Sequence, residues 1–256
     1  DDVRFQHGAL HCPGGLGGKQ FRVAGLADTQ TDVLLRIEHL DGSSSNQRLT
    51  RDAPAVTIPE RPSALEVVRT YVVLGVEHIL LGVDHLLFVL ALLLLVRGVR
   101  RLVATVTAFT VAHSITLGAA TLGFVHVPPA PVEAVIALSI LFLASELARR
   151  HAGGEADLTE RFPWLVAFSF GLLHGFGFAG ALSEVGMPAQ AVPLALLFFN
   201  VGVEIGQLAF IGAVLGVGWL IRRSALHAPR QWQRLAAYAI GSVAAFWVVE
   251  RTVAIF

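Results

Sequence analysis

Residues 74–88 read LGVEHILLGVDHLLF and contain one pattern twice: Leu-Gly-Val, then an acidic residue, then a histidine. The two copies start seven residues apart, at Leu74 and Leu81. Apart from the two acid and histidine pairs the stretch is apolar, which is typical of a helix inside a lipid bilayer. Ionisable side chains are costly at that depth, so their presence predicts a functional site.

The rest of the sequence predicts a polytopic membrane protein. Hydrophobic residues make up 54% of the 256 residues and charged residues only 15%, unlike the composition of soluble domains. Apolar stretches of about 20 residues, the length that crosses about 30 Å of hydrocarbon, recur between charged or proline-rich breaks. We predict six spans, at about residues 69–96, 101–124, 130–148, 163–184, 191–221 and 232–254.

The N-terminal part has a different pattern. Within residues 1–60, short stretches of alternating apolar residues are separated by turn-rich segments, which predicts a small β-rich domain. Residues 61–68 are the expected linker to a transmembrane domain over residues 69–256. The predicted fold class is an all-α polytopic membrane protein, a six-helix transmembrane bundle preceded by a small β-rich extracytoplasmic domain.

Arginines predict the orientation of the spans. Three connections, at residues 97–101, 148–161 and 221–234, are rich in arginine, and they alternate with two that contain neither arginine nor lysine. The positive-inside rule places the arginine-rich connections in the cytoplasm. In a bacterial inner membrane, the N-terminal domain and the C-terminus would then lie in the periplasm, with lipids as neighbours of the spans.

Composition also excludes some classes of function. The net charge is zero and basic residues are confined to short connections, so nothing predicts nucleic-acid binding. The single cysteine, Cys12, cannot form an intramolecular disulfide.

Five ionisable residues are expected near the middle of four different spans. At a rise of 1.5 Å per residue, they are Asp84, His85, His113, His174 and Glu204. Imidazole and carboxylate groups without thiolates suit divalent nickel, cobalt, zinc or iron. Each residue could instead form a hydrogen bond between helices, but the matched depth favours a metal site. Ser114, Asn200 and Gln207 lie within about one turn and are expected to support it.

The repeat in residues 74–88 predicts a second polar layer. In a continuous helix, a spacing of seven places His78 about 10 Å outside His85 on nearly the same face. Glu133 in the third span is expected at the depth of His78, whereas Glu77 could equally extend toward the interface. Because a moving ion needs more than one binding position, His78 and Glu133 are predicted to form an outer metal station.

Two glycine patterns coincide with the polar residues. GLLHG (Gly171 to Gly175) contains His174, and GVEIG (Gly202 to Gly206) contains Glu204. Such GxxxG patterns allow helix backbones to approach closely. We expect this packing to bring His174 and Glu204 together.

The pattern HxxxxxDH at residues 78–85 and the segment PVEAVIALSILFL at residues 131–143 resemble the signatures of the HupE/UreJ family of nickel permeases. Further segments around His113, His174 and Glu204 are similar to its long branch, which has an extracytoplasmic domain before the spans. The resemblance implies secondary transport of Ni²⁺ or Co²⁺, in connection with a metalloenzyme maturation system. It also implies that the ion is carried by His78, Asp84, His85 and Glu133.

An intramembrane zinc hydrolase is the alternative. His85, His113 and His174 would bind Zn²⁺ with an open fourth position, and a nearby carboxylate, Asp84 or Glu204, would act as general base. Such an enzyme would act on a lipid-like substrate. The sequence therefore predicts a metal transporter, with no catalytic residues, ahead of a metal-dependent enzyme.

Overall fold

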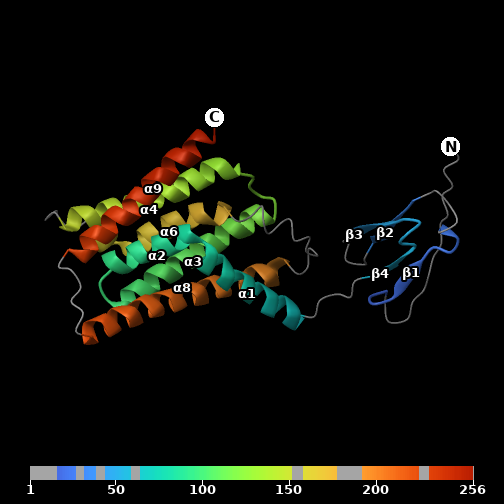
Figure 1. Cartoon of the computed structure of the whole chain (residues 1–256), viewed down its shortest axis with the longest axis horizontal. Coiled ribbons are helices and arrows are strands. Elements are labelled where there is room, and N and C mark those ends of the chain that lie inside the picture. Colours follow the sequence, from blue (N-terminus) through green and yellow to red (C-terminus); the bar gives the residue numbers. More distant parts are fainter. Residues whose placement is uncertain are drawn as a thin grey trace. The chain divides into compact units, whose positions relative to one another are not determined.

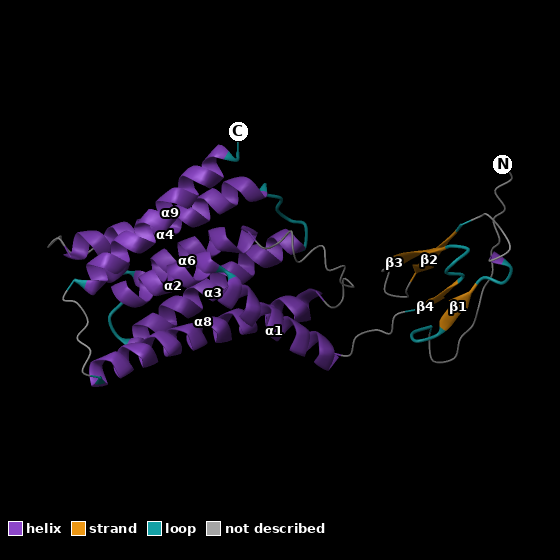
Figure 2. Cartoon of the chain, viewed as in Figure 1, coloured by secondary structure: helices purple, strands orange, loops and turns teal. Residues whose placement is uncertain are grey.

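The computed structural model describes residues 16–26, 32–38, 44–58, 64–151, 158–177, 192–224 and 231–255. The chain divides into two units, Asp1–Leu65 and Glu66–Phe256. Figure 1 labels the elements and Figure 2 distinguishes the strands of the first unit from the helices of the second. Cys12 and the end of the predicted fourth span, residues 178–184, lie outside the described residues.

The N-terminal unit is β-rich, as predicted. Its strands are β1 (Gln20–Arg22), β2 (Val33–Glu38), β3 (Ser44–Leu49) and β4 (Ala55–Thr57). They form two antiparallel pairs, β1 with β4 and β2 with β3. Alternation along β2 buries Ile37 and leaves Leu34 72% exposed, so one face of this pair packs on a small core.

The second unit is helical. Its elements are α1 (Ala64–Leu81), α2 (Val83–Leu95), α3 (Val99–Thr121), α4 (Pro129–His151), α5 (Leu158–Arg161), α6 (Pro163–His174), η2 (Gly175–Gly177), α8 (Val192–Arg223) and α9 (Trp232–Val253). Within the described ranges, α3, α4 and α8 are long and apolar enough to cross a membrane, and α1 with α2 could form a fourth, bent span. The structure thus supports a helical membrane protein, while the count of six spans stays a prediction.

The predicted first span is not one continuous helix. α1 ends at Leu81 and α2 begins at Val83, with a bend of 73° between them. Gly82 between them has an extended backbone, and a Cβ atom there would lie only 2.7 Å from the His78 carbonyl oxygen. The assumption of a continuous helix through residues 74–88 is therefore wrong, because the backbone turns at a glycine where a side chain would not fit, whereas a bent span over residues 69–96 stays a prediction.

Two apolar cores hold the helices together. The larger includes Phe88, Phe109 and Leu143 and joins α2, α3, α4, α6, α8 and α9. The smaller includes Ile79, Leu117 and Phe199 and joins α1, α3 and α8. In Figure 1, α9 runs along α4 and α8 runs along α3, in agreement with their contacts.

Both predicted GxxxG patterns pack closely, but not against each other. A Cβ atom at Gly171 would lie 2.5 Å from the Phe109 carbonyl oxygen of α3, and one at Gly175 would lie 2.4 Å from that of His113. Gly202 and Gly206 face α1 instead, against the Val72 carbonyl oxygen and Ile79 respectively. The expectation that these patterns bring His174 and Glu204 together is wrong, because each pattern packs on a different helix.

We expect Gly202→Ala to lower the free energy of unfolding by about 1 to 3 kcal/mol. The added methyl group would lie 2.2 Å from the Val72 carbonyl oxygen, so α1 and α8 must move apart. Gly212→Ala, in the same helix with nothing within 4 Å, is the matched control and should be neutral or slightly stabilising. Thermal unfolding of the detergent-purified protein measures both, and equal midpoints for the two variants would contradict the prediction.

Candidate metal centre

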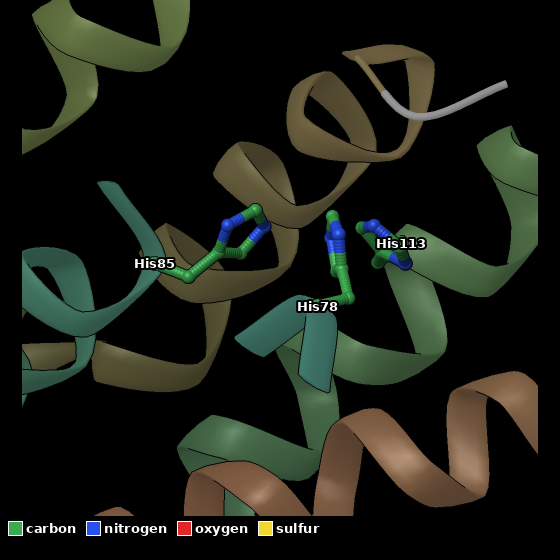
Figure 3. A group of neighbouring side chains, drawn as sticks. All are labelled: His78, His85 and His113. Atoms are coloured by element: carbon green, nitrogen blue, oxygen red, sulfur yellow. The ribbon is translucent and has the colours of Figure 1, made fainter. Parts of the chain in front are cut away.

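Three histidines from three helices form a group that can hold a metal ion. His78 of α1, His85 of α2 and His113 of α3 each offer one ring nitrogen, and these nitrogens lie within 4.8 Å of one another. Figure 3 shows the three side chains gathered between their helices. We call them the histidine cluster. Three imidazoles leave further coordination positions open, as at metal sites that exchange a ligand.

The bend at Gly82 creates this cluster. It brings the rings of His78 and His85 to a centroid distance of 4.8 Å, although a straight helix would separate the residues by about 10 Å. The prediction of an outer layer containing His78 is therefore wrong. His78 belongs to the same layer as His85 and His113.

Asn200 determines which nitrogen His113 presents to the cluster. The Asn200 amide nitrogen donates to the Leu196 carbonyl oxygen at 2.8 Å, which directs the amide oxygen toward His113. That oxygen lies 3.2 Å from His113 Nδ1, so Nδ1 carries the proton and donates. His113 Nε2 is then an unprotonated acceptor, the form of imidazole that binds a metal.

Ser139 fixes the tautomer of His174 in the same way, but it contacts Nε2 rather than Nδ1. The Ser139 hydroxyl donates its one proton to the Ile136 carbonyl oxygen at 2.7 Å. It can then only accept from His174 Nε2, which lies 3.0 Å away, so His174 Nδ1 is the unprotonated nitrogen. The His174 and His85 rings have centroids 5.3 Å apart, which places His174 beside the histidine cluster.

Several of these nitrogens are buried without a hydrogen bond. Within the described part of the chain, His85 Nε2, His113 Nε2 and His174 Nδ1 have no hydrogen-bond partner. Burying a polar atom in this state is unfavourable unless something else contacts it. A cation bound in the histidine cluster would contact ring nitrogens of this kind.

A cavity of about 270 Å³ adjoins the cluster. Its lining residues come from α1, α2, α4, α6, η2, α9 and the α1–α2 junction: His78, Gly82, Asp84, His85, Glu133, Ile136, His174, Gly177 and Arg251. Four predicted metal residues besides His85 thus face one space, namely His78, Asp84, Glu133 and His174. The cavity gives the histidine cluster a polar approach through an otherwise apolar unit.

Arg251 is a charged site residue that the sequence analysis missed. Its Nη2 contacts Asp84 Oδ2 at 2.9 Å, and its Nη1 donates to the Glu133 carbonyl oxygen at 3.1 Å. An arginine within the predicted sixth span is costly in a membrane, so its position could have indicated a functional residue from sequence alone. It lies next to Glu250 near the end of that span, a position at which a long side chain can extend to the interface.

The structure does not place Glu204 in the histidine cluster. Its two carboxylate oxygens contact the hydroxyls of Thr107 and Thr110 at 2.6 and 2.5 Å, and Thr110 also lies 3.0 Å from Gln207 Oε1. The predicted meeting of Glu204 with the mid-depth histidines is therefore wrong, because Thr107 and Thr110 precede His113 by six and three residues, and Glu204 lies about one to two turns from it along α3. The two remaining predicted supports are also elsewhere, since Ser114 donates to the Thr110 carbonyl oxygen and Glu77 is exposed.

We expect Asn200→Leu to weaken nickel binding by about 10- to 100-fold, the usual effect of losing the group that orients a metal-binding histidine. The variant removes the acceptor for His113 Nδ1, so the ring loses its fixed tautomer and orientation. Asn200→Asp keeps an acceptor oxygen at this position and should retain most of the affinity. Isothermal titration of the purified protein with NiCl₂ tests this, and wild-type affinity in Asn200→Leu would contradict it.

Comparison with known proteins gives one match. A family model described as HupE / UreJ protein matches residues 54–251, a range that includes the histidine cluster, His174 and Arg251. No curated protein and no solved structure matches the chain.

Proposed function

The chain belongs to the HupE/UreJ family, and from this premise we propose that it takes up a divalent transition metal, nickel or cobalt, through the histidine cluster. One observation carries the proposal. Ring nitrogens from three helices lie within 4.8 Å of one another inside an apolar helical unit. A divalent ion bound between these nitrogens would be held by three helices at once.

The chemistry of the cluster suits a transported ion. Neutral imidazoles bind late first-row divalent metals well, whereas the absence of thiolate among the described lining residues gives no preference for Cu(I). Three neutral ligands bind less tightly than a complete set with charged ligands would. An ion that must leave again requires binding of this intermediate strength.

We propose that the cavity is the approach from the periplasm. Its residues lie near the start of α4, the end of α6 and the end of α9, which adjoin the connections expected outside the cytoplasm. Asp84 and Glu133 would attract a cation there, and His85 and His174 would pass it to His113. This orientation in a bacterial inner membrane follows from the arginine-rich connections.

We propose that Glu204 forms the next station inward. Thr107, one of its partners, is six residues from His113 along α3, or about 9 Å toward the arginine-rich end. A carboxylate with two threonine hydroxyls is an oxygen-rich position between α3 and α8. This arrangement would supply the second binding position that movement of an ion requires.

A zinc hydrolase is the second candidate, because three histidines beside a cavity also resemble a site for a metal-bound water. One contact favours transport. Asp84, a proposed general base, already forms an ion pair with Arg251 at 2.9 Å. It is therefore engaged by a cation rather than by a metal-bound water.

Nickel uptake into proteoliposomes tests the proposed function, with metal analysis of the purified protein in parallel. We expect saturable uptake of Ni²⁺ or Co²⁺ and little metal retained after purification. One tightly held zinc ion per chain, without flux of any of these metals, would contradict transport and support the hydrolase.

We further propose that the imported metal supplies a metalloenzyme maturation system in the cytoplasm. The family connection to hydrogenase and urease supports this. Deleting the gene from its host should lower nickel-enzyme activity at limiting nickel, and added nickel should restore it. Unchanged activity at limiting nickel would contradict this role.

A further inference from the structure

We propose that Arg251 is a built-in competitor of the transported metal: its guanidinium occupies Asp84 until a divalent cation displaces it. We call the Asp84 and Arg251 pair the latch. The inference rests on the proposed function and adds to it a residue that determines affinity and selectivity.

The contacts of Arg251 place a positive charge at the cavity itself. Its guanidinium reaches Asp84 Oδ2 at 2.9 Å and the Glu133 carbonyl oxygen at 3.1 Å, thereby joining α9 to α2 and α4. Among the described residues that line the cavity, Arg251 is the only one with a permanent positive charge. A cation that approaches Asp84 must therefore meet this guanidinium.

Asp84 and Arg251 are accessible from outside the helical unit, whereas His85 is buried. The side chains of Asp84 and Arg251 are 23% and 19% exposed, and His85, the next residue after Asp84, is 8% exposed. The latch thus lies between the surface and the histidine cluster. An ion would contact Asp84 before it reaches the buried imidazoles.

Simultaneous binding of the guanidinium and a divalent ion to the Asp84 carboxylate is energetically unfavourable. Arginine remains protonated in proteins, so it cannot lose its charge when a metal arrives. Two cations in a partly buried cavity repel each other strongly because water screens them poorly there. Binding of the metal therefore requires Arg251 to move away from Asp84.

The end of α9 offers Arg251 another position. Its guanidinium carbon already lies 5.2 Å from the centre of the Trp247 ring, one helical turn earlier, within the range of a cation–π contact. Arg251 is also in the last turn of α9, where the unpaired carbonyl groups favour a cation. After displacement, the side chain can keep these two stabilising contacts.

The latch would discriminate by charge. A monovalent ion has the same charge as the guanidinium, so it gains no greater Coulomb attraction from Asp84 than Arg251 already has. A divalent ion has twice the charge and is then held by the nearby histidines as well. Sodium and potassium should consequently leave the latch closed.

Equilibrium binding of NiCl₂ to the full, detergent-purified chain tests the latch. Arg251→Gln should lower the dissociation constant by about tenfold, the scale expected for removing one partly buried ion pair and its repulsion of the metal. Arg251→Lys keeps the charge and should bind with nearly wild-type affinity. Arg234→Gln removes an exposed arginine from the start of α9 and is the control for net charge.

Uptake kinetics distinguish the latch from a purely structural role of Arg251. In proteoliposomes, Arg251→Gln should reach half-saturation at a lower nickel concentration, with a lower maximal rate because release becomes slower. Removing Arg251 in an Asp84→Asn background should not tighten binding, because the guanidinium no longer has a carboxylate to occupy. Such non-additivity identifies the pair as one unit.

Unchanged or weaker nickel binding by Arg251→Gln would overturn the latch, provided that Arg251→Lys and wild type bind. If wild type transports nickel and only this tightening is missing, the latch fails and the proposed function stands. If wild type neither binds nor transports nickel, both fail. If Arg251→Gln does not fold, nickel affinity is compared between Asp84→Asn and the double variant Asp84→Asn with Arg251→Lys. A lower affinity in the double variant than in Asp84→Asn alone would overturn the latch.

Discussion

His85→Ala should abolish nickel uptake and weaken nickel binding by more than about 100-fold, since losing a direct ligand costs more than losing the group that orients one. His85 has the most central position of the set. Its ring centroid lies 4.8 Å from that of His78, 5.3 Å from that of His174 and 6.3 Å from that of His113. Its removal therefore takes away the ligand that connects the cavity to the cluster.

A second variant separates this effect from a packing defect. The His85 ring lies edge-on to Phe109, so alanine leaves a void in addition to removing the nitrogens. His85→Phe keeps an aromatic ring of similar size without nitrogens and should also lose uptake. His126→Ala removes an exposed histidine and should transport normally. Wild-type uptake by His85→Phe would exclude His85 as a ligand.

Gly82→Ala is expected to weaken nickel binding by about tenfold or more while the protein still folds. The new Cβ atom would lie 2.7 Å from the His78 carbonyl oxygen and 3.0 Å from His85 Nδ1. Either the bend or the His85 ring must shift, and metal ligands tolerate displacements of only about 0.5 Å. The substitution thus acts on two ligands at once.

Gly118→Ala is a suitable control for this experiment. It adds the same methyl group to α3, where the nearest atom outside the local backbone is Leu196 Cδ1 at 3.9 Å, an ordinary contact. Nickel titration and thermal unfolding should be measured on both variants. Full nickel affinity in Gly82→Ala would show that the bend can accommodate a side chain and that the cluster does not depend on its exact angle.

The repeat in residues 74–88 shows where prediction from sequence ends. Gly75 and Gly82 stand in the same local sequence, Leu-Gly-Val-acid-His, yet Gly75 lies inside α1 and Gly82 interrupts the helix. Gly75 faces Gly202 of α8, so its role is close packing, whereas Gly82 is next to the His78 carbonyl oxygen and the His85 ring. The packing of Gly75 on α8 is therefore not encoded in the repeated pattern, which is the same at both glycines.

The helical rise predicted the level of three histidines but not that of Glu204. His85, His113 and His174 were expected at one level, and their rings are indeed neighbours. Glu204 instead contacts Thr107 and Thr110, which precede His113 by six and three residues on the same face of α3. The rise per residue gives distances along one helix, whereas the shift of one helix along its neighbour depends on how the two pack together.

The anchoring of His113 and His174 has a bioenergetic consequence. A chain of histidines could conduct protons if each ring accepted a proton at one nitrogen and released it at the other. Here the protonated nitrogens face the Asn200 amide oxygen and the Ser139 hydroxyl, and that hydroxyl is itself bonded to the Ile136 carbonyl oxygen. Amide oxygens do not pass protons onward, so these branches end there. Under the proposed function, His113 and His174 would therefore not relay protons beyond the groups that anchor them.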